Sequence, residues 1–244
     1  MNTKVFLVTG ATSGIGRATC LALLNKGINI IGIGRNGANV LDIKEKFKNF
    51  FFRTVDLAEI DSLDNIIKDL VDAFGKFDGL IHCAGLEETL PLSQYTHSRV
   101  KEIFHINVFV TIELLKLISK KKYSNDQASI ILFSSVMGNL GQAGKVGYCG
   151  TKSAVLGIVR SSALELAKRK FRVNAISPGV VKTPMTEKLF ASLTEEQVKQ
   201  IINMHPLGIG EVEDVVPLIE FLISNGSLWV TGQNFIVDGG YSCQ

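Results

Sequence analysis

The chain contains 244 residues, of which 46% are hydrophobic and 20% are charged, a balance that supplies a large core and excludes an intrinsically disordered protein. Its 26 basic and 23 acidic residues are spread along the sequence and leave a net charge of +3. No large basic surface is therefore expected, which argues against nucleic acid as a partner.

Short β-rich runs alternate with longer amphipathic segments along the whole chain. This alternation predicts an α/β fold in which helices cover both faces of a parallel sheet. We expect one doubly wound domain over residues 1–244 with a seven-stranded sheet. The predicted strands are 4–9, 28–33, 51–55, 79–84, 129–134, 172–177 and 234–238, and the predicted helices lie near 15–26, 37–48, 60–73, 97–119, 148–168 and 211–223.

One long segment, residues 183–210, interrupts this rhythm between the sixth strand and the last helix. It contains an amphipathic helix near 194–203 between Pro184 and Pro206. An insertion after a strand end is well placed to cover a site, so residues 184–210 are predicted to form a substrate lid, with a packed surface excursion as the alternative. In the last helix, Pro217 predicts either a kink or a later start.

A glycine-rich turn, TGATSGIG, follows the first strand and opens the first helix with Gly10, Gly14 and Gly16. In a doubly wound (Rossmann) sheet, glycines at this turn let the backbone approach a pyrophosphate, and the helix N-terminus favours its charge. The GxxxGxG spacing differs from the generic GxGxxG pattern, so the turn alone is weak support for a dinucleotide site. Its position between a strand and a helix supplies the required context.

A second motif, GYCGTK at residues 147–152, places Tyr148 and Lys152 four positions apart and therefore on one face of a helix. As a proton donor, a tyrosine with a pKa of about 10 is weak at neutral pH. An ammonium about 4 Å away would favour the phenolate by roughly 4 kcal/mol at an effective dielectric constant of about 20. The pair is thus a candidate acid–base couple.

Together with SPG at 177–179, these motifs resemble the short-chain dehydrogenase/reductase family in order and spacing, from Val5 to Tyr241. The segments HPLGIG and VTGQNFIVDGG make the pattern most similar to β-ketoacyl carrier-protein reductases. The resemblance implies an NAD(P)-dependent oxidoreductase that interconverts a carbonyl and a secondary alcohol by hydride transfer. Reduction of 3-oxoacyl thioesters is one candidate activity beside sugar, steroid and small-ketone reduction.

The resemblance also implies four catalytic residues. Tyr148 would move the proton, and Lys152 would lower the phenol pKa and bind the ribose. In FSSVMG, Ser135 would bind the substrate oxygen, with Ser134 as the alternative. Asn107 would hold a water molecule linked to the lysine.

The family pattern likewise implies the cofactor contacts. Asp56 resembles an adenine-contacting aspartate, the Val181 backbone would meet the nicotinamide carboxamide, and the Thr183 hydroxyl would assist. In HCAG, Cys83 replaces the family's usual asparagine, which leaves a hydrogen bond between the central strands in doubt. The full predicted set is Gly10, Thr12, Ser13, Gly14, Ile15, Gly16, Arg35, Asp56, Leu57, Ala84, Gly85, Tyr148, Lys152, Pro178, Gly179, Val181 and Thr183.

The end of the second strand favours NADP(H) over NAD(H). Gly34 stands where an acid would bind the ribose 2′-hydroxyl, Arg35 follows, and the chain from Gly16 to Asp42 has no Asp or Glu in between. A guanidinium can hold a 2′-phosphate that a carboxylate would repel. Ser13 occupies the place of a second basic residue that NADP-preferring members often carry, so NAD(H) stays the alternative.

The substrate and the partners are less well defined by the sequence. Residues 86–98, 136–147 and 184–205 would line the mouth of the site and have few charges, which predicts a largely apolar carbonyl substrate. Relatives imply a homotetramer or homodimer through the helices at 97–119 and 148–168. The alternative to an enzyme is a catalytically silent nucleotide-binding scaffold, which would be expected to lack one of the four catalytic residues.

The cysteines and the apolar runs bear on location. Cys20, Cys83, Cys149 and Cys243 have no CxxC or metal-ligand spacing, which predicts reduced thiols and no metal site. The run Val5–Val8 is too short for a signal peptide, and no run approaches the roughly 18 apolar residues of a membrane helix. A cytoplasmic protein without a membrane partner is expected.

Overall fold

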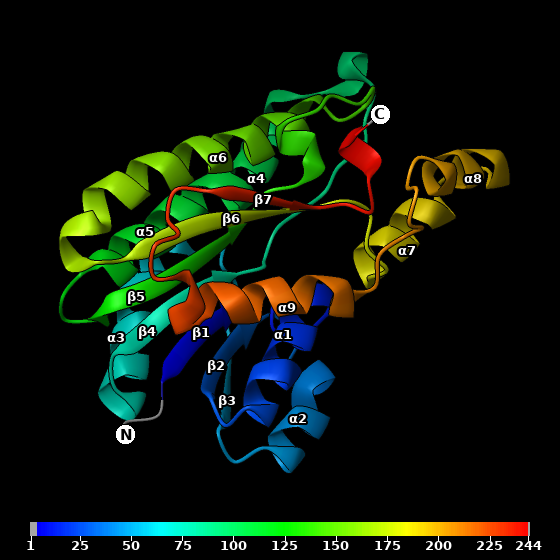
Figure 1. Ribbon diagram of the computed structural model, residues 1–244. Coiled ribbons are helices and arrows are strands. Elements are labelled where there is room, and N and C mark those ends of the chain that lie inside the picture. The colour runs from blue at the N-terminus through cyan, green and yellow to red at the C-terminus, as the bar shows by residue number, and fades with distance from the viewer. Residues whose placement is uncertain (1–3, 244) are drawn as a thin grey trace.

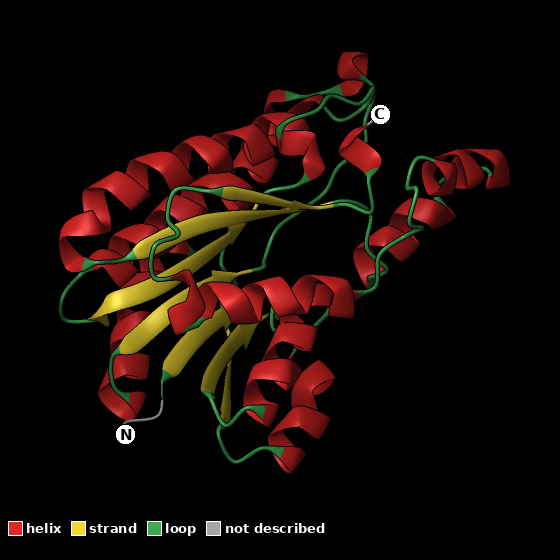
Figure 2. Cartoon of the chain, viewed as in Figure 1, coloured by secondary structure: helices red, strands yellow, loops and turns green. Residues whose placement is uncertain are grey.

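The computed structural model describes residues 4–243 as a seven-stranded parallel sheet in the order β3-β2-β1-β4-β5-β6-β7 (Figures 1 and 2). The predicted doubly wound sheet is confirmed. Residues 1–3 and 244 of the predicted domain lie outside the described range. The strands are β1 (Val5–Thr9), β2 (Asn29–Gly34), β3 (Phe50–Thr54), β4 (Phe77–His82), β5 (Ser124–Phe133), β6 (Arg172–Pro178) and β7 (Asn234–Val237).

Helices cover both faces of the sheet, as Figure 1 shows. Along β1, Phe6 and Val8 point to one apolar cluster, and Val5 and Leu7 point to the other, because successive side chains of a strand face opposite ways. The first cluster packs beneath α1 (Gly14–Asn25), α2 (Leu41–Lys46) and α9 (Val212–Ile223). The second packs beneath α3 (Leu63–Phe74), α5 (Val110–Ser119) and α6 (Val146–Leu166).

The predicted helix at 97–119 is continuous in extent but not regular. It consists of α4 (His97–Phe104), a π-helical turn at His105–Phe109, and α5. A π-turn shifts the backbone hydrogen bonds by one residue and is frequent at functional sites. Here the turn carries Asn107, one of the four predicted catalytic residues.

Two features of the C-terminal third differ from expectation. Residues 184–210, predicted to contain one helix, contain two, α7 (Pro184–Ala191) and α8 (Glu195–Asn203). The Thr183 side chain caps α7, and Pro184 occupies its first turn. The later start predicted from Pro217 is wrong, because α9 begins at Val212, where Glu211 and Asp214 form reciprocal capping hydrogen bonds. Pro217 is therefore accommodated inside the helix.

Figure 1 shows α7 and α8 projecting away from the main body beside the carboxyl ends of the strands. None of their side chains is fully buried. Within the described part of the chain, no helix combines the length and the apolar character that crossing a lipid bilayer would require.

Candidate active site

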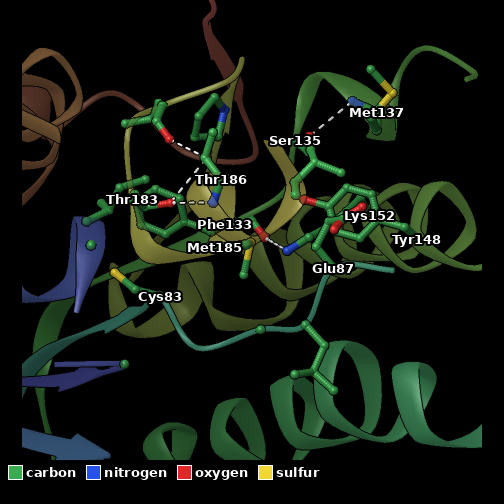
Figure 3. A pocket seen from close by; sticks show the side chains of 18 of the residues that line it. Cys83, Glu87, Phe133, Ser135, Met137, Tyr148, Lys152, Thr183, Met185 and Thr186 are labelled. Carbon is green, nitrogen blue, oxygen red and sulfur yellow. Dashed lines mark hydrogen bonds between the residues drawn. The ribbon is translucent and has the colours of Figure 1, made fainter. Parts of the chain in front are cut away.

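A cavity of about 840 Å³ opens where the carboxyl ends of the central strands meet residues 184–210. In Figure 3, Ser135, Tyr148, Lys152 and Glu87 lie on one side of it, opposite Thr183, Met185 and Thr186. This edge is where open parallel sheets bind ligands. The cavity is lined by Ser135 and by every predicted cofactor contact: Gly10, Thr12, Ser13, Gly14, Ile15, Gly16, Arg35, Asp56, Leu57, Ala84, Gly85, Tyr148, Lys152, Pro178, Gly179, Val181 and Thr183.

The glycine turn leaves room for a large anion. Gly10 and Gly14 have φ of +66° and +49°, and a Cβ at Gly16 would lie 2.3 Å from the Gly10 carbonyl oxygen. The Ser13 side chain caps no amide of α1, and the first turn of that helix has no acidic residue. The amides of this turn are therefore available to a pyrophosphate, and the residues fit a dinucleotide.

The end of β2 contributes Gly34 and Arg35 to the cavity lining, and neither residue is acidic. Arg35 is exposed and lines the cavity, and a Cβ at Gly34 would lie 2.9 Å from the Thr12 side chain. Asp42, the first acid after the glycine turn, pairs with Arg17 instead, and the hydrogen bond from Arg17 lowers the pKa of the Asp42 carboxyl. Neither member of that pair lines the cavity.

The two serines after β5 have different partners. The Ser134 hydroxyl donates to the Lys152 carbonyl oxygen at 2.8 Å and so holds β5 against α6. The Ser135 oxygen accepts from the Met137 amide at 3.2 Å and keeps its proton for another acceptor. The geometry therefore favours Ser135 over Ser134 as the serine that can meet a ligand oxygen.

Tyr148 and Lys152 share the inner face of α6, but their electrostatics differ from the prediction. The Lys152 ammonium donates to the Phe133 carbonyl oxygen at 2.9 Å and lies 5.6 Å from the centre of the Tyr148 ring. Burial raises the pKa of Tyr148 to about 12 against the opposing effect of a Ser135 hydrogen bond, and burial lowers the pKa of Lys152 to about 8. The net shift of the phenol pKa is therefore upward, opposite to the expected one, because burial is the largest contribution.

Asn107 lies behind the cavity wall. Its side-chain oxygen accepts from the Leu86 amide at 2.8 Å, and its amide nitrogen donates to the Leu86 carbonyl at 2.9 Å and to the Thr151 hydroxyl at 3.0 Å. The side chain thus ties the loop after β4 to α6, beside Lys152. Its part in a water relay stays a prediction.

The replacement of asparagine by Cys83 leaves a hydrogen bond between the central strands in doubt, but side chains of Thr9 and His82 connect β1 to β4 by hydrogen bonds. The Thr9 hydroxyl lies 2.7 Å from Nδ1 of His82 and accepts from the Ala84 amide at 3.0 Å. Nε2 of His82 lies 3.1 Å from the Thr111 hydroxyl, and burial lowers the pKa of His82 to about 3. His82 is therefore a neutral structural residue.

Two of the segments predicted to line the mouth with few charges, residues 86–98 and 136–147, contribute an ion pair to the cavity. Lys145 and Glu87 form a salt bridge inside the cavity, and their side chains are only 8% and 15% exposed. Nothing in the spacing of these residues indicates that they meet, because they come from two loops whose conformations the sequence does not reveal. The site is therefore charged beside Tyr148, whereas residues 184–210 line it with uncharged side chains, among them Met185, Leu189 and Gln200.

Comparison with known proteins agrees with this architecture. A family model described as enoyl-(acyl carrier protein) reductase matches residues 10–242. The 3-oxoacyl-[acyl-carrier-protein] reductases of Thermotoga maritima and Staphylococcus aureus are 31% and 32% identical over 242 and 245 aligned residues, which cover 97% and 98% of both chains.

Two solved structures extend the comparison. A 4-hydroxyisoleucine dehydrogenase complexed with NADH superposes with a TM-score of 0.91 at 28% identity, and ElxO with NADP bound with a TM-score of 0.87 at 26% identity. In both cases the match covers 99% of this chain and 100% of the other. This chain belongs to the short-chain dehydrogenase/reductase family and is an oxidoreductase of that family.

Proposed function

We propose that the protein is an NADP(H)-dependent reductase that interconverts a carbonyl group and a secondary alcohol. The observation that carries the proposal is the convergence of Ser135, Tyr148 and Lys152 on one side of a cavity that the glycine turn before α1 also lines. A nicotinamide dinucleotide, when bound, supplies the hydride for reduction or accepts it in oxidation. The glycine turn, Arg35 and the β6–α7 segment would hold it.

The protein's own groups would handle the oxygen of the substrate. In reduction, the Tyr148 hydroxyl gives its proton to the carbonyl oxygen as the carbon gains the hydride, so that the C=O bond becomes a C–OH group. Ser135 donates a hydrogen bond to the same oxygen and stabilises its developing charge. Lys152 supplies a positive charge beside the phenolate that remains and can bind ribose hydroxyls.

The two serines make a matched test. Ser135→Ala should lower kcat/KM by roughly 10- to 1000-fold, because it deletes one hydrogen-bond donor to the developing oxyanion. Ser134→Ala should change kcat/KM far less, and should instead lower the free energy of unfolding by about 1 kcal/mol through loss of its bond to the Lys152 carbonyl. Steady-state kinetics and urea unfolding separate the two effects. The reverse pattern would assign the oxygen-binding role to Ser134.

Cofactor preference gives a second test. Arg35→Ala should raise the KM for NADPH by roughly 10- to 100-fold, since a charge-assisted hydrogen bond to the 2′-phosphate is lost, and should leave the KM for NADH within about threefold. Arg53→Ala, which removes a surface arginine paired with Asp69, is the control. A wild-type enzyme that prefers NADH would refute the NADP(H) assignment.

The names of the relatives span two substrate types, 3-oxoacyl carrier-protein thioesters and 4-hydroxyisoleucine. A panel of ketones and alcohols, followed at the NADPH absorbance band, should contain both types together with sugar and steroid ketones. Turnover of at least one ketone supports the proposed function, and no turnover with any member of the panel contradicts it.

Three further expectations belong to this proposal. Residues 184–210 act as a lid, supported by Met185, Leu189 and Ile201, which line the cavity from the lid side. The protein assembles as a homotetramer or homodimer, for which the exposed apolar residues Phe109, Ile112 and Leu164 on α5 and its preceding turn and on α6 provide surface. It acts in the cytoplasm.

A further inference from the structure

An ion pair formed by Lys145 and Glu87 lies beside Tyr148. Nζ of Lys145 lies 5.6 Å from the centre of the Tyr148 ring, the same distance as Nζ of Lys152 on α6. Lys145 precedes α6, and Glu87 belongs to the loop after β4; both line the cavity. Figure 3 shows Glu87 on the same side of the cavity as Tyr148 and Lys152. The mechanism proposed above does not use this pair.

Each member of the pair has unused hydrogen-bonding capacity. A lysine ammonium can donate three hydrogen bonds. The Lys145 ammonium donates two, one to Oε1 of Glu87 and one to the Thr89 hydroxyl at 2.8 Å. The Thr89 hydroxyl also donates to Oε1 at 2.8 Å. Among residues 4–243, no hydrogen-bond partner is present for the third proton of Lys145 or for Oε2 of Glu87. The pair therefore offers one donor and one acceptor of opposite charge.

A purely structural tie would not require these charges. The two loops are already joined by the Leu90 amide, which donates to the Gly144 carbonyl at 2.7 Å, and by the Gly147 amide, which donates to the Tyr95 hydroxyl at 3.2 Å. Removing an ion pair from water carries a desolvation cost that its mutual attraction does not reliably offset. Two such charges in the wall of a ligand cavity are better explained by a ligand that binds them.

Given the carbonyl-reducing function proposed above, we propose that the substrate is an oxo or hydroxy α-amino acid whose carboxylate binds Lys145 and whose ammonium binds Glu87. A simple carboxylate on Lys145 would also approach the Glu87 carboxylate, and a simple amine on Glu87 would approach the Lys145 ammonium. Only a zwitterion places a charge of opposite sign against each of the two protein charges. Its two charged groups stand on one carbon, a separation that suits two protein charges already in contact.

Substrate preference tests the inference. Reduction by NADPH is compared for levulinate, for methyl propyl ketone and for α-amino oxo acids with the carbonyl on the γ or δ carbon. We expect kcat/KM for one amino acid to exceed the values for levulinate and for the neutral ketone by roughly 10- to 100-fold, the effect of hydrogen bonds to charged groups. A preference for the neutral ketone, or equal use of levulinate, would overturn the inference.

Variants separate recognition from loop structure. Glu87→Gln, Lys145→Gln and the double variant replace charges with amides that can still link the loops. Each should lower the ratio of kcat/KM for the amino acid to that for the neutral ketone by roughly 10-fold or more. Lys26→Met, which breaks a surface pair with Glu220 outside the cavity, should leave the ratio unchanged. Ratios that stay at the wild-type value in all three cavity variants mean that the pair is only structural.

A binding measurement keeps this inference separate from the catalytic proposal. Norvaline carries both charged groups, pentanoate and pentylamine carry one each, and none has a ketone, so the thermal unfolding temperature of the protein with each one reports binding without turnover. A rise with norvaline alone, lost in Glu87→Gln, supports the amino-acid site even if no ketone is reduced. No rise with norvaline, or an equal rise with pentanoate, rejects the site even if neutral ketones are reduced.

Discussion

Tyr148→Phe should lower kcat/KM for ketone reduction by roughly 100- to 10,000-fold, the range that a positioned general acid contributes. Phenylalanine keeps the ring and its packing in α6 and removes only the hydroxyl. The affinity for NADPH, measured by fluorescence titration, should stay within about threefold of wild type, because the remaining cofactor contacts are unchanged. The loss should therefore appear in kcat. Turnover near the wild-type rate would refute the assignment of Tyr148 as proton donor.

Tyr123→Phe is the matched control for this change. Tyr123 does not line the cavity, and its hydroxyl donates to Oδ1 of Asp64 at 3.2 Å. Removing that hydrogen bond should lower the free energy of unfolding by about 1 kcal/mol and leave kcat/KM unchanged. The two substitutions delete the same atom, so a difference in their kinetics measures the role of position 148.

The raised pKa of Tyr148 also predicts a directional asymmetry. A pKa of about 12 means that the phenol holds its proton at neutral pH, as reduction requires, whereas alcohol oxidation requires the phenolate as base. In wild type, kcat/KM for oxidation should therefore increase roughly tenfold for each pH unit below pH 8, where the phenol is mostly protonated and Lys152 keeps its charge. This dependence should be absent from Tyr148→Phe.

The fold and most of the cavity could be predicted because they depend on local periodicity. Apolar runs alternating with amphipathic segments define the layers, and a parallel sheet then gathers the loops after β1, β2, β4, β5 and β6 at one edge. The four-residue spacing of Tyr148 and Lys152 places both on one helix face. Each of these inferences needs only neighbours in sequence or the general geometry of α/β sheets.

What could not be predicted depends on loop conformation and on burial. Lys145 and Glu87 are far apart in the sequence and meet only because the loops after β4 and β5 are joined. The direction of the Lys152 ammonium depends on the Phe133 carbonyl, which the spacing of the motif does not specify. The π-turn around Asn107 is not among the predicted features, because residues 97–119 are predicted as one continuous helix.

Lys152→Met should abolish most activity and yet stabilise the cofactor-free protein at neutral pH. Burial depresses the pKa of Lys152 from its ordinary 10.5 to about 8, which corresponds to about 3 kcal/mol of destabilisation when the charged form is kept at low pH. Methionine removes this cost and leaves the Phe133 carbonyl without its partner, a loss of about 1–2 kcal/mol. The variant should therefore have a free energy of unfolding about 1–2 kcal/mol higher than wild type at pH 7.

The sign of the pH dependence makes this prediction specific. Between pH 8 and 10.5, the unfolded wild-type chain holds a proton on Lys152 that the folded chain has released, so the lysine's contribution to wild-type stability rises with pH across this window. Urea unfolding at pH 7 and pH 10 should accordingly show the advantage of Lys152→Met at pH 7 and its loss at pH 10. Lys101→Met, at an exposed position on α4, should show neither effect.

The steady-state kinetics of Lys152→Met test whether the buried Lys152 charge is required for the reaction. Loss of the ammonium should lower kcat/KM by roughly 100-fold or more, because a positive charge fixed beside Tyr148 stabilises the phenolate left after proton transfer. In wild type, kcat/KM for reduction should fall above pH 8 as the free enzyme loses the Lys152 proton. A variant that is more stable but inactive would mean that the fold tolerates an unfavourable buried cation for the sake of the reaction. A variant that is less stable at pH 7 would instead make Lys152 a structural residue and remove the main electrostatic support for the proposed mechanism.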